Sequence, residues 1–191
     1  MKRLAPLAIA ALLAAPAPTL VSAAEPAEDG LHFVASNLFD TANGTFRRWR
    51  VSEARIDPDD PGDSFVRVEV DLASVDTGNE DRDDHLRTAD FFDVAMHPTA
   101  SVHVHTAEKL GTGVEGRDHY RAFFDFDLHG VQKTLPGEFT VWSVDPFVVE
   151  GSVEVNRLDF GIGAPRTFWN PLSITEEIPV TFRASIPRVG D

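Results

Sequence analysis

Two neighbouring histidines are the first residues in this sequence that suggest chemistry. His103 and His105 are two positions apart, so in a strand they point to the same side and can approach one metal ion together. No third ligand stands at a usual spacing from them, and Val102 and Val104 mark the opposite, apolar side. We therefore expect an outward-facing histidine pair, with no metal site and no cofactor.

A run of acidic residues is the second candidate, because paired carboxylates can act as general acid and base. The run consists of Glu80, Asp81, Asp83 and Asp84. Acids are favourable in the first turn of a helix, and Thr77 and Glu80 have the spacing of a capping box. No nucleophile elbow, zinc-protease motif or phosphate-binding glycine loop occurs, and the absence of cysteine removes thiol catalysis. These acids are therefore interpreted as a solvated helix face, and we expect a protein that is not an enzyme.

The elements that position these residues are mostly strands. Residues 65–72 alternate between apolar and charged side chains, as a half-buried antiparallel strand does. Residues 101–106, 120–128, 138–144, 147–155 and 177–186 show similar patterns, and one short helix is expected at about residues 79–88. This pattern predicts an all-β sandwich or barrel. Alternation does not tell whether the apolar faces meet each other or line a cavity.

The N-terminal residues and the charge indicate an exported protein. Residues 1–23 have a basic start, an apolar stretch and small residues before Ala24, as in a signal peptide cleaved after Ala23. An uncleaved membrane anchor is the alternative, but the apolar run is short for a spanning helix. We expect residues 24–191 to form a single domain in the periplasm. The formal net charge of −14 argues against nucleic acid as a partner.

Four segments resemble motifs of the YceI-like family of periplasmic proteins. They are Asn43–Phe46; Val75–Arg87, with the following Asp90–Asp93 and His97–Thr99; Leu128–Lys133; and Val155–Gly161. Their order and spacing agree with the family across nearly all of residues 24–191. The chain departs from the family in two places: little sequence precedes His32 and Phe33, and the proline after the third motif is shifted to Pro136.

This resemblance implies an eight-stranded antiparallel lipocalin-like β-barrel with an internal apolar cavity. It also implies that the protein sequesters or carries a long-chain isoprenoid lipid, either an isoprenoid quinone or a polyprenyl phosphate. The alternative function is a non-enzymatic module for envelope interactions or the stress response, with an incidental cavity. A membrane redox protein or an envelope enzyme would be a compatible partner, and a homodimer is compatible with the resemblance.

Phenylalanine is the aromatic residue used most, with 14 Phe against 1 Tyr and 3 Trp, and it can line a dry cavity without needing a polar partner. Core packing is the simpler role for any one of these rings. The residues expected to line the cavity are Phe33, Phe46, Val68, Val70, Phe91, Phe92, Val104, Phe124, Phe126, Trp142, Phe160 and Phe182. The residues expected to contact a lipid head group are Arg48, Arg50, His85 and His129. The acidic surroundings favour a neutral quinone head over a phosphate.

Overall fold

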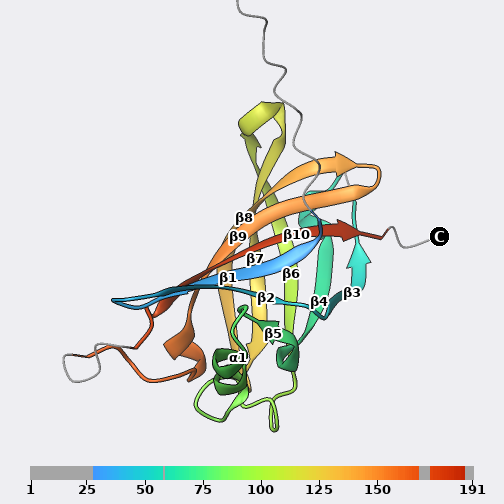
Figure 1. The fold of residues 1–191 in the computed structure, drawn as a ribbon. Helices are drawn as coiled ribbons and strands as arrows, with labels where there is room; N and C mark the ends of the chain where they lie inside the picture. The colour runs from blue at the N-terminus through green and yellow to red at the C-terminus, as the bar shows by residue number, and fades with distance from the viewer. Residues whose placement is uncertain (1–27, 58, 168–172, 188–191) are drawn as a thin grey trace, which may run out of the picture.

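The structure is a computed structural model that describes residues 28–57, 59–167 and 173–187. The expected signal peptide lies outside these residues. Within them, ten strands form one antiparallel sheet in the order β3-β4-β6-β7-β8-β9-β10-β1-β2-β5, and the sheet is strongly curled (Figure 1). None of the helices in this part of the chain is long and apolar enough to span a membrane.

The elements follow one another with short connections. The strands are β1 (Gly30–Ser36), β2 (Thr41–Phe46), β3 (Trp49–Arg55), β4 (Phe65–Asp71), β5 (Val75–Asp76), β6 (Thr99–Thr112), β7 (Asp118–Leu128), β8 (Val131–Val144), β9 (Phe147–Asn156) and β10 (Glu177–Ile186). The helix is α1 (Glu80–Arg87), and the short 3₁₀ segments are η1 (Pro61–Asp63), η2 (Leu72–Ser74), η3 (Val114–Gly116) and η4 (Arg157–Phe160).

The expected number of eight strands is wrong, because two long strands are each divided. A bend at Arg47 and Arg48 separates β2 from β3, and η2 separates β4 from β5. In η2 the side chain of Asp71 accepts a hydrogen bond from the Ala73 amide (2.9 Å), which turns the chain out of the extended conformation. The all-β class and the antiparallel pairing are confirmed, and α1 is the one α-helix in the described part of the chain.

The positions of β2 and β3 in the sheet explain why the sheet is curled. β2 pairs with β1 at one end of the strand order, whereas β3 pairs with β4 at the other end. Only Arg47 and Arg48 separate these two strands in the chain, so the ends of the sheet must approach each other. The Arg47 amide donates to the Ser74 carbonyl (3.1 Å), and the Asp71 amide donates to the Arg48 carbonyl (2.9 Å). Among the described residues no strand pairs with the outer edge of β3, so the barrel is incompletely closed there.

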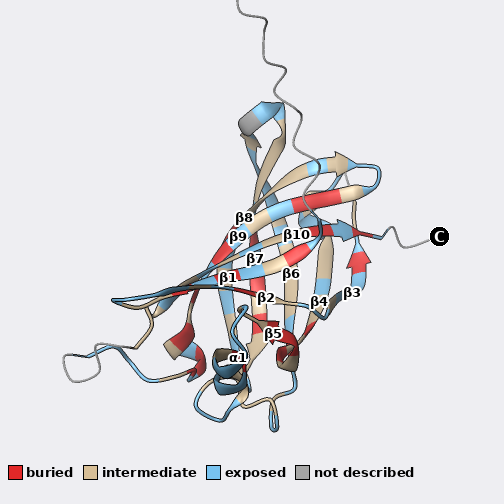
Figure 2. Ribbon diagram, in the orientation of Figure 1, coloured by how far each residue is buried: buried red, intermediate tan, exposed pale blue. Residues whose placement is uncertain are grey.

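Side chains alternate between the inside and the outside of the curled sheet, as expected for strands with one buried face. Phe124 and Phe126 of β7 are buried, while Asp125 between them faces outward and pairs with the His105 side chain. Figure 2 shows buried residues in red between intermediate and exposed residues along the strands, and further buried residues next to α1. The apolar interior is therefore continuous from the open end of the sheet to the end that α1 covers.

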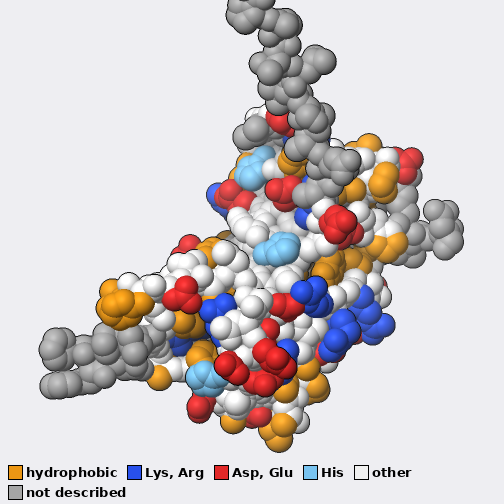
Figure 3. Space-filling model, viewed as in Figure 1, with side chains coloured by type: hydrophobic (Ala, Val, Ile, Leu, Met, Phe, Trp, Pro, Cys, Tyr) orange, Lys and Arg blue, Asp and Glu red, His pale blue; other side chains and the backbone are white. Residues whose placement is uncertain are grey.

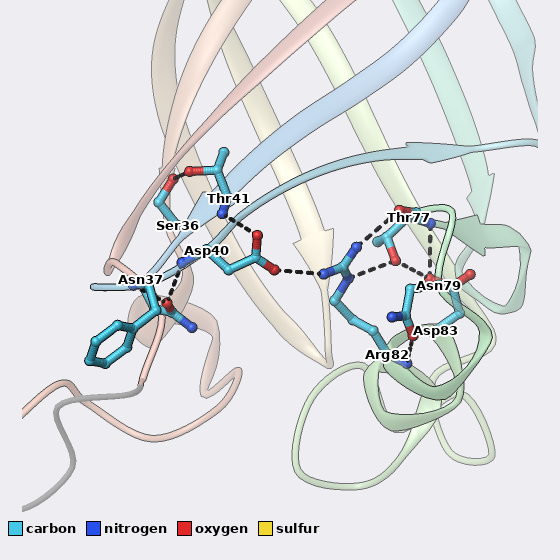
Figure 4. A network of polar contacts seen from close by, with 9 residues as sticks. Ser36, Asn37, Asp40, Thr41, Thr77, Asn79, Arg82 and Asp83 are labelled. Carbon is cyan, nitrogen blue, oxygen red and sulfur yellow. Dashed lines mark hydrogen bonds and ion pairs between the residues drawn. The ribbon is translucent and has the colours of Figure 1, made fainter.

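Helix α1 covers one end of the barrel, and its start differs from the expected start. Asn79 is the N-cap residue, and its side chain accepts a hydrogen bond from the Arg82 amide (3.0 Å). Thr77 does not cap the helix but donates to Asp83 through its amide (2.9 Å) and its hydroxyl (2.5 Å) (Figure 4). Asp83 is buried, with 7% exposure, so the acidic run is not wholly a solvated face. The Arg82 guanidinium extends this network to Asp40 before β2 (3.2 Å).

A buried arginine fastens the segment after β9 at the same end. Arg157, in the family-like segment Val155–Gly161, is only 3% exposed. Its guanidinium donates to the carbonyl oxygens of Ile162 (2.7 Å), Ala164 (2.8 Å), Ile174 (2.9 Å) and Thr175 (2.9 Å). Five donors in a fixed planar arrangement suit arginine for such multiple contacts. This side chain therefore ties η4 to the stretch that leads into β10.

Candidate ligand-binding cavity

The curled sheet encloses a cavity of about 810 Å³. Its walls are apolar side chains from β3, β4, β6, β7, β8, β9 and β10, mostly valine and phenylalanine. The rings of Phe124 and Phe182 stand 5.8 Å apart between their centroids and tilt against each other inside the barrel. This volume falls within the range of about 300–1,000 Å³ that is usual for small-molecule sites.

The floor of the cavity is a packed apolar layer next to α1. Phe126 lines the cavity and contacts Phe160, whose exposure is 0%, with ring centroids 6.1 Å apart. Beside this pair, the rings of Phe33, Phe46 and Phe92 form a chain with centroid separations of 5.6 and 5.7 Å. A ligand in the cavity would therefore end against side chains and not against water.

The mouth lies at the opposite end, where the β3–β4 connection and the start of β7 meet the ends of β8 and β10. The polar side chains of Arg55, Asp57, Ser64, His105, Asp118 and Tyr120 line this part of the cavity. Arg55 pairs with Asp63 (2.6 Å), and Lys109 pairs with Asp118 (2.7 Å). The hydrogen bond to Asp118 raises the pKa of Lys109 above its ordinary value. The mouth is thus a ring of polar and paired charged groups around an apolar interior.

Half of the twelve residues expected to line the cavity do so. These six are Val68, Val70, Val104, Phe124, Phe126 and Phe182. Four others pack at the floor and close the barrel instead: Phe33, Phe46, Phe92 and Phe160. Phe91 lies beside the His85 ring, with centroids 4.9 Å apart, and not in the cavity. Sequence alternation identified the inner face but not the depth at which the cavity ends.

Trp142 is on the outside of the barrel, contrary to the expectation. The pairing of β8 with β9 shifts between Val141 and Ser143, and this irregularity adds a residue to one strand. Such a bulge breaks the simple alternation of inward and outward side chains. The Trp142 ring, 37% exposed, lies under the guanidinium of Arg117 at 3.9 Å and near that of Arg183 at 5.2 Å.

The four residues expected to contact a head group do not line the cavity. Arg48 pairs with Asp71 (2.8 Å) and Arg50 with Glu69 (2.6 Å), both on the exposed outer surface. His85 belongs to α1, and the Nδ1 atom of His129 is 2.9 Å from the Phe160 carbonyl oxygen at the floor. Figure 3 shows acidic side chains gathered over α1, with basic side chains beside them. The mouth residues were missed because they come from β3, the β3–β4 connection, β6 and β7, which only the folded sheet brings together.

The candidate catalytic groups are held in structural contacts. Asp83 accepts two hydrogen bonds from Thr77, and Asp84 pairs with Arg87 (2.8 Å). His103 stands on the outer face of β6, opposite the cavity-lining Val102 and Val104, whereas His105 lies at the rim and also borders the cavity mouth. Asp125 of β7 lies beside these two histidines.

A curled antiparallel sheet around one apolar cavity, with a helix over one end, defines the class of lipocalin-like binding folds. Within this class the chain belongs to the YceI-like domain family, and the model of that family matches residues 23–186. A UPF0312 protein of Azotobacter vinelandii is 34% identical over 140 residues, which cover 69% of this chain and 70% of the relative. A UPF0312 protein of Pseudomonas syringae pv. tomato is 34% identical over 158 residues, which cover 78% and 77%.

Solved structures show the same fold at lower sequence identity. BcnA of Burkholderia cenocepacia superimposes with a TM-score of 0.69 and 18% identity, covering 81% of this chain and 94% of BcnA. A polyisoprenoid binding domain from Saccharophagus degradans superimposes with a TM-score of 0.60 and 21% identity, covering 81% and 91%. These similarities establish the architecture in which the cavity lies.

Proposed function

We propose that this protein binds a long-chain isoprenoid lipid in its cavity and carries or sequesters it in the periplasm. The observation that supports this most is the apolar cavity of about 810 Å³, whose one end is packed and whose other end is polar. A ligand with a long apolar tail and a small polar head matches that division. The name of the Saccharophagus degradans domain agrees with a ligand of this class.

The energetics require a long tail. Each buried methylene contributes about 0.8 kcal/mol, so a five-carbon isoprene unit contributes roughly 3–4 kcal/mol. Association and chain ordering cost on the order of 4–15 kcal/mol. Micromolar binding corresponds to about −8 kcal/mol, so several enclosed units are needed before it is reached. Affinity therefore comes from the tail, and selectivity from the head.

The cavity has room for such a tail. A water molecule takes up about 30 Å³ in the liquid, and a hydrocarbon carbon takes up a similar volume. A cavity of 810 Å³ then holds roughly 27 non-hydrogen atoms, or roughly five isoprene units. A longer chain would extend through the mouth.

The mouth favours a neutral head group. Arg55 is already paired with Asp63, and Lys109 with Asp118, while Asp57 adds a further acid. A phosphate would meet these carboxylates, and like charges at short range are unfavourable. A quinone ring avoids this repulsion and can accept a hydrogen bond from the Tyr120 hydroxyl, which lies at the mouth. An isoprenoid quinone is therefore the preferred ligand within this proposal, and a membrane redox protein the matching donor or acceptor.

The first test is to identify what the protein carries. The chain is purified from its periplasm without detergent, measured by native mass spectrometry and extracted with organic solvent. An isoprenoid present at one molecule per protein is the expected result. A folded but empty protein that also takes up neither quinones nor polyprenyl phosphates would contradict the proposal and favour the envelope interaction module.

A pair of variants on one strand tests whether the lipid occupies this cavity. Val68→Trp fills part of the cavity, whereas Glu69→Trp adds the same side chain on the outer face of β4. We expect Val68→Trp to reduce the retained lipid at least tenfold while Glu69→Trp retains it, with circular dichroism confirming that both fold. Equal lipid content in the two variants would place the ligand elsewhere.

A further inference from the structure

The pairing of β6 with β7 brings an acid to the two outward histidines. His103 stands directly opposite Asp125 in the ladder, and His105 lies two residues further along β6. The Asp125 Oδ2 atom is 3.0 Å from His105 Nε2 and 3.9 Å from His103 Nδ1. The three residues offer donor atoms that all lie within 4.8 Å of one another. This third group is distant in sequence, so spacing along the chain did not reveal it.

Asp125 and His105 each use one polar atom in a hydrogen bond, and in each side chain the second polar atom remains available to bind a metal ion. Asp125 Oδ1 accepts the Thr134 hydroxyl (2.6 Å), which leaves Oδ2 directed at the histidines. His105 Nδ1 is 2.8 Å from the Thr106 hydroxyl, which leaves Nε2. The His105 Nε2 atom is buried from solvent and makes no hydrogen bond of acceptable geometry, although the Asp125 Oδ2 atom is only 3.0 Å away. A buried polar atom without a partner is unusual in a folded protein.

We propose that His103, His105 and Asp125 bind a divalent transition-metal ion of the zinc class on the outer face of the barrel. Ligand bonds of about 2.0–2.2 Å place two donors of one ion roughly 3–3.5 Å apart. The observed separations of 3.0 and 3.9 Å therefore need only small side-chain movements. Two imidazoles and one carboxylate are typical ligands for such ions, whereas Mg²⁺ and Ca²⁺ prefer oxygen alone.

The charges around the cluster suit a cation. Burial and the nearby Arg67 lower the pKa of His103. The Thr134 hydrogen bond lowers the pKa of Asp125, which keeps the carboxylate ionised. Arg67 pairs with Glu53 (3.1 Å) on the neighbouring strand, so its charge is partly compensated. Phe65 contacts the His103 ring edge-on, with centroids 5.7 Å apart, and limits its rotation.

The site would keep open positions. Three protein ligands leave at least one place in a tetrahedral zinc site for water or an outside group. His105 also borders the cavity, so the ion would lie close to the mouth. This inference does not depend on the lipid proposal, because it rests on the distances among these three side chains and not on a bound lipid.

A second group of similar composition provides the internal control. Asp93, His97 and His129 also place ligand atoms within 4.8 Å of one another, at the closed end of the barrel. His129 Nδ1 there contacts the Phe160 carbonyl (2.9 Å), and its backbone has a positive φ of 55°, so this residue has a structural role. His97→Gln removes a possible ligand from that second group and leaves the first intact.

The test is isothermal titration of the chain, free of any histidine tag and treated with EDTA, with Zn²⁺ and in parallel with Mg²⁺. The expected result is one Zn²⁺ bound per chain. The Zn²⁺ affinity should fall at least tenfold in His105→Gln and in Asp125→Asn. It should not change in His97→Gln. Thr134→Val should weaken binding about tenfold, as the loss of an orienting contact does. Mg²⁺ should not compete.

Thermal unfolding gives a second readout that does not depend on heat of binding. Zn²⁺ should raise the melting temperature of the parent chain and of His97→Gln, but not that of His105→Gln, because only folded protein offers the site. The absence of Zn²⁺ uptake, or its loss in His97→Gln alone, would overturn the proposal. The substituted side chains are partly exposed, and unchanged circular dichroism would confirm that the variants fold.

Discussion

The two ends of this barrel differ in almost every physical respect. The closed end is a packed layer in which Phe160 and Arg157 are nearly inaccessible to solvent and polar groups find buried partners. The mouth is lined by exposed, locally paired charges such as Arg55 with Asp63. Most of the segments that resemble the YceI-like family lie at the closed end, including Val75–Arg87 and Leu128–Lys133. The family-like segments therefore form most of the floor, whereas the polar mouth residues lie outside these segments.

The largest effect should come from the closed end. Arg157→Leu removes the donors of one buried and several partly buried carbonyl groups. A buried group costs about 1–3 kcal/mol when left unpaired and a partly buried group less, so a loss on the order of 3–5 kcal/mol is expected. Urea unfolding measures it, with Arg55→Leu at the mouth as the matched control. A surface ion pair contributes about 0–1 kcal/mol, so the control should change little. Similar losses in both variants would remove the distinction between the two ends.

A smaller effect is expected when the length of the ligand tail is varied against the depth of the cavity. Binding of quinones with one to eight isoprene units should strengthen with each unit up to roughly five, by at most about 3–4 kcal/mol per unit, and then level off at the packed floor. Fluorescence quenching or competitive displacement gives the affinities. Continued strengthening beyond that length would mean that the floor opens, and no dependence on length would mean that the tail is not enclosed.

The smallest effect should come from the start of α1. Asn79→Ala removes the side chain that caps the helix and should cost about 1 kcal/mol of stability without changing lipid content. Asn79→Asp serves as the control, because aspartate caps equally well. Urea unfolding combined with lipid extraction tests both points. A marked loss of lipid in Asn79→Ala would show that α1 controls access to the cavity.

Alternation in the sequence predicted which face of each strand is inward. It placed Val68, Val104 and Phe124 correctly, because one buried face imposes a period of two residues. It failed at Trp142, where a bulge interrupts the period, and at the two divided strands, where Arg47 and η2 bend the chain. Bulges depend on the pairing partner and leave little signal in a single sequence.

Contacts between distant segments were the second limit. The mouth unites Arg55 of β3 with Asp118 and Tyr120 of β7, which are far apart in sequence. Asp125 reaches His103 only through the register of β6 and β7. Phe160 could be recognised as apolar, but whether it borders a void or fills the floor depends on Phe126 above it. Three-dimensional packing decides these questions, and periodicity carries no information about it.

The outer edge of β3 has a consequence for how the protein behaves when concentrated. An unpaired strand edge is a template on which other chains can add, and this is a common route to aggregation. Here the pairing irregularity between Val51 and Glu53 distorts the strand, and Arg50, Glu53 and Arg55 place charges along it. These features disfavour growth of the sheet from one molecule to the next. A homodimer would therefore have to form through another surface.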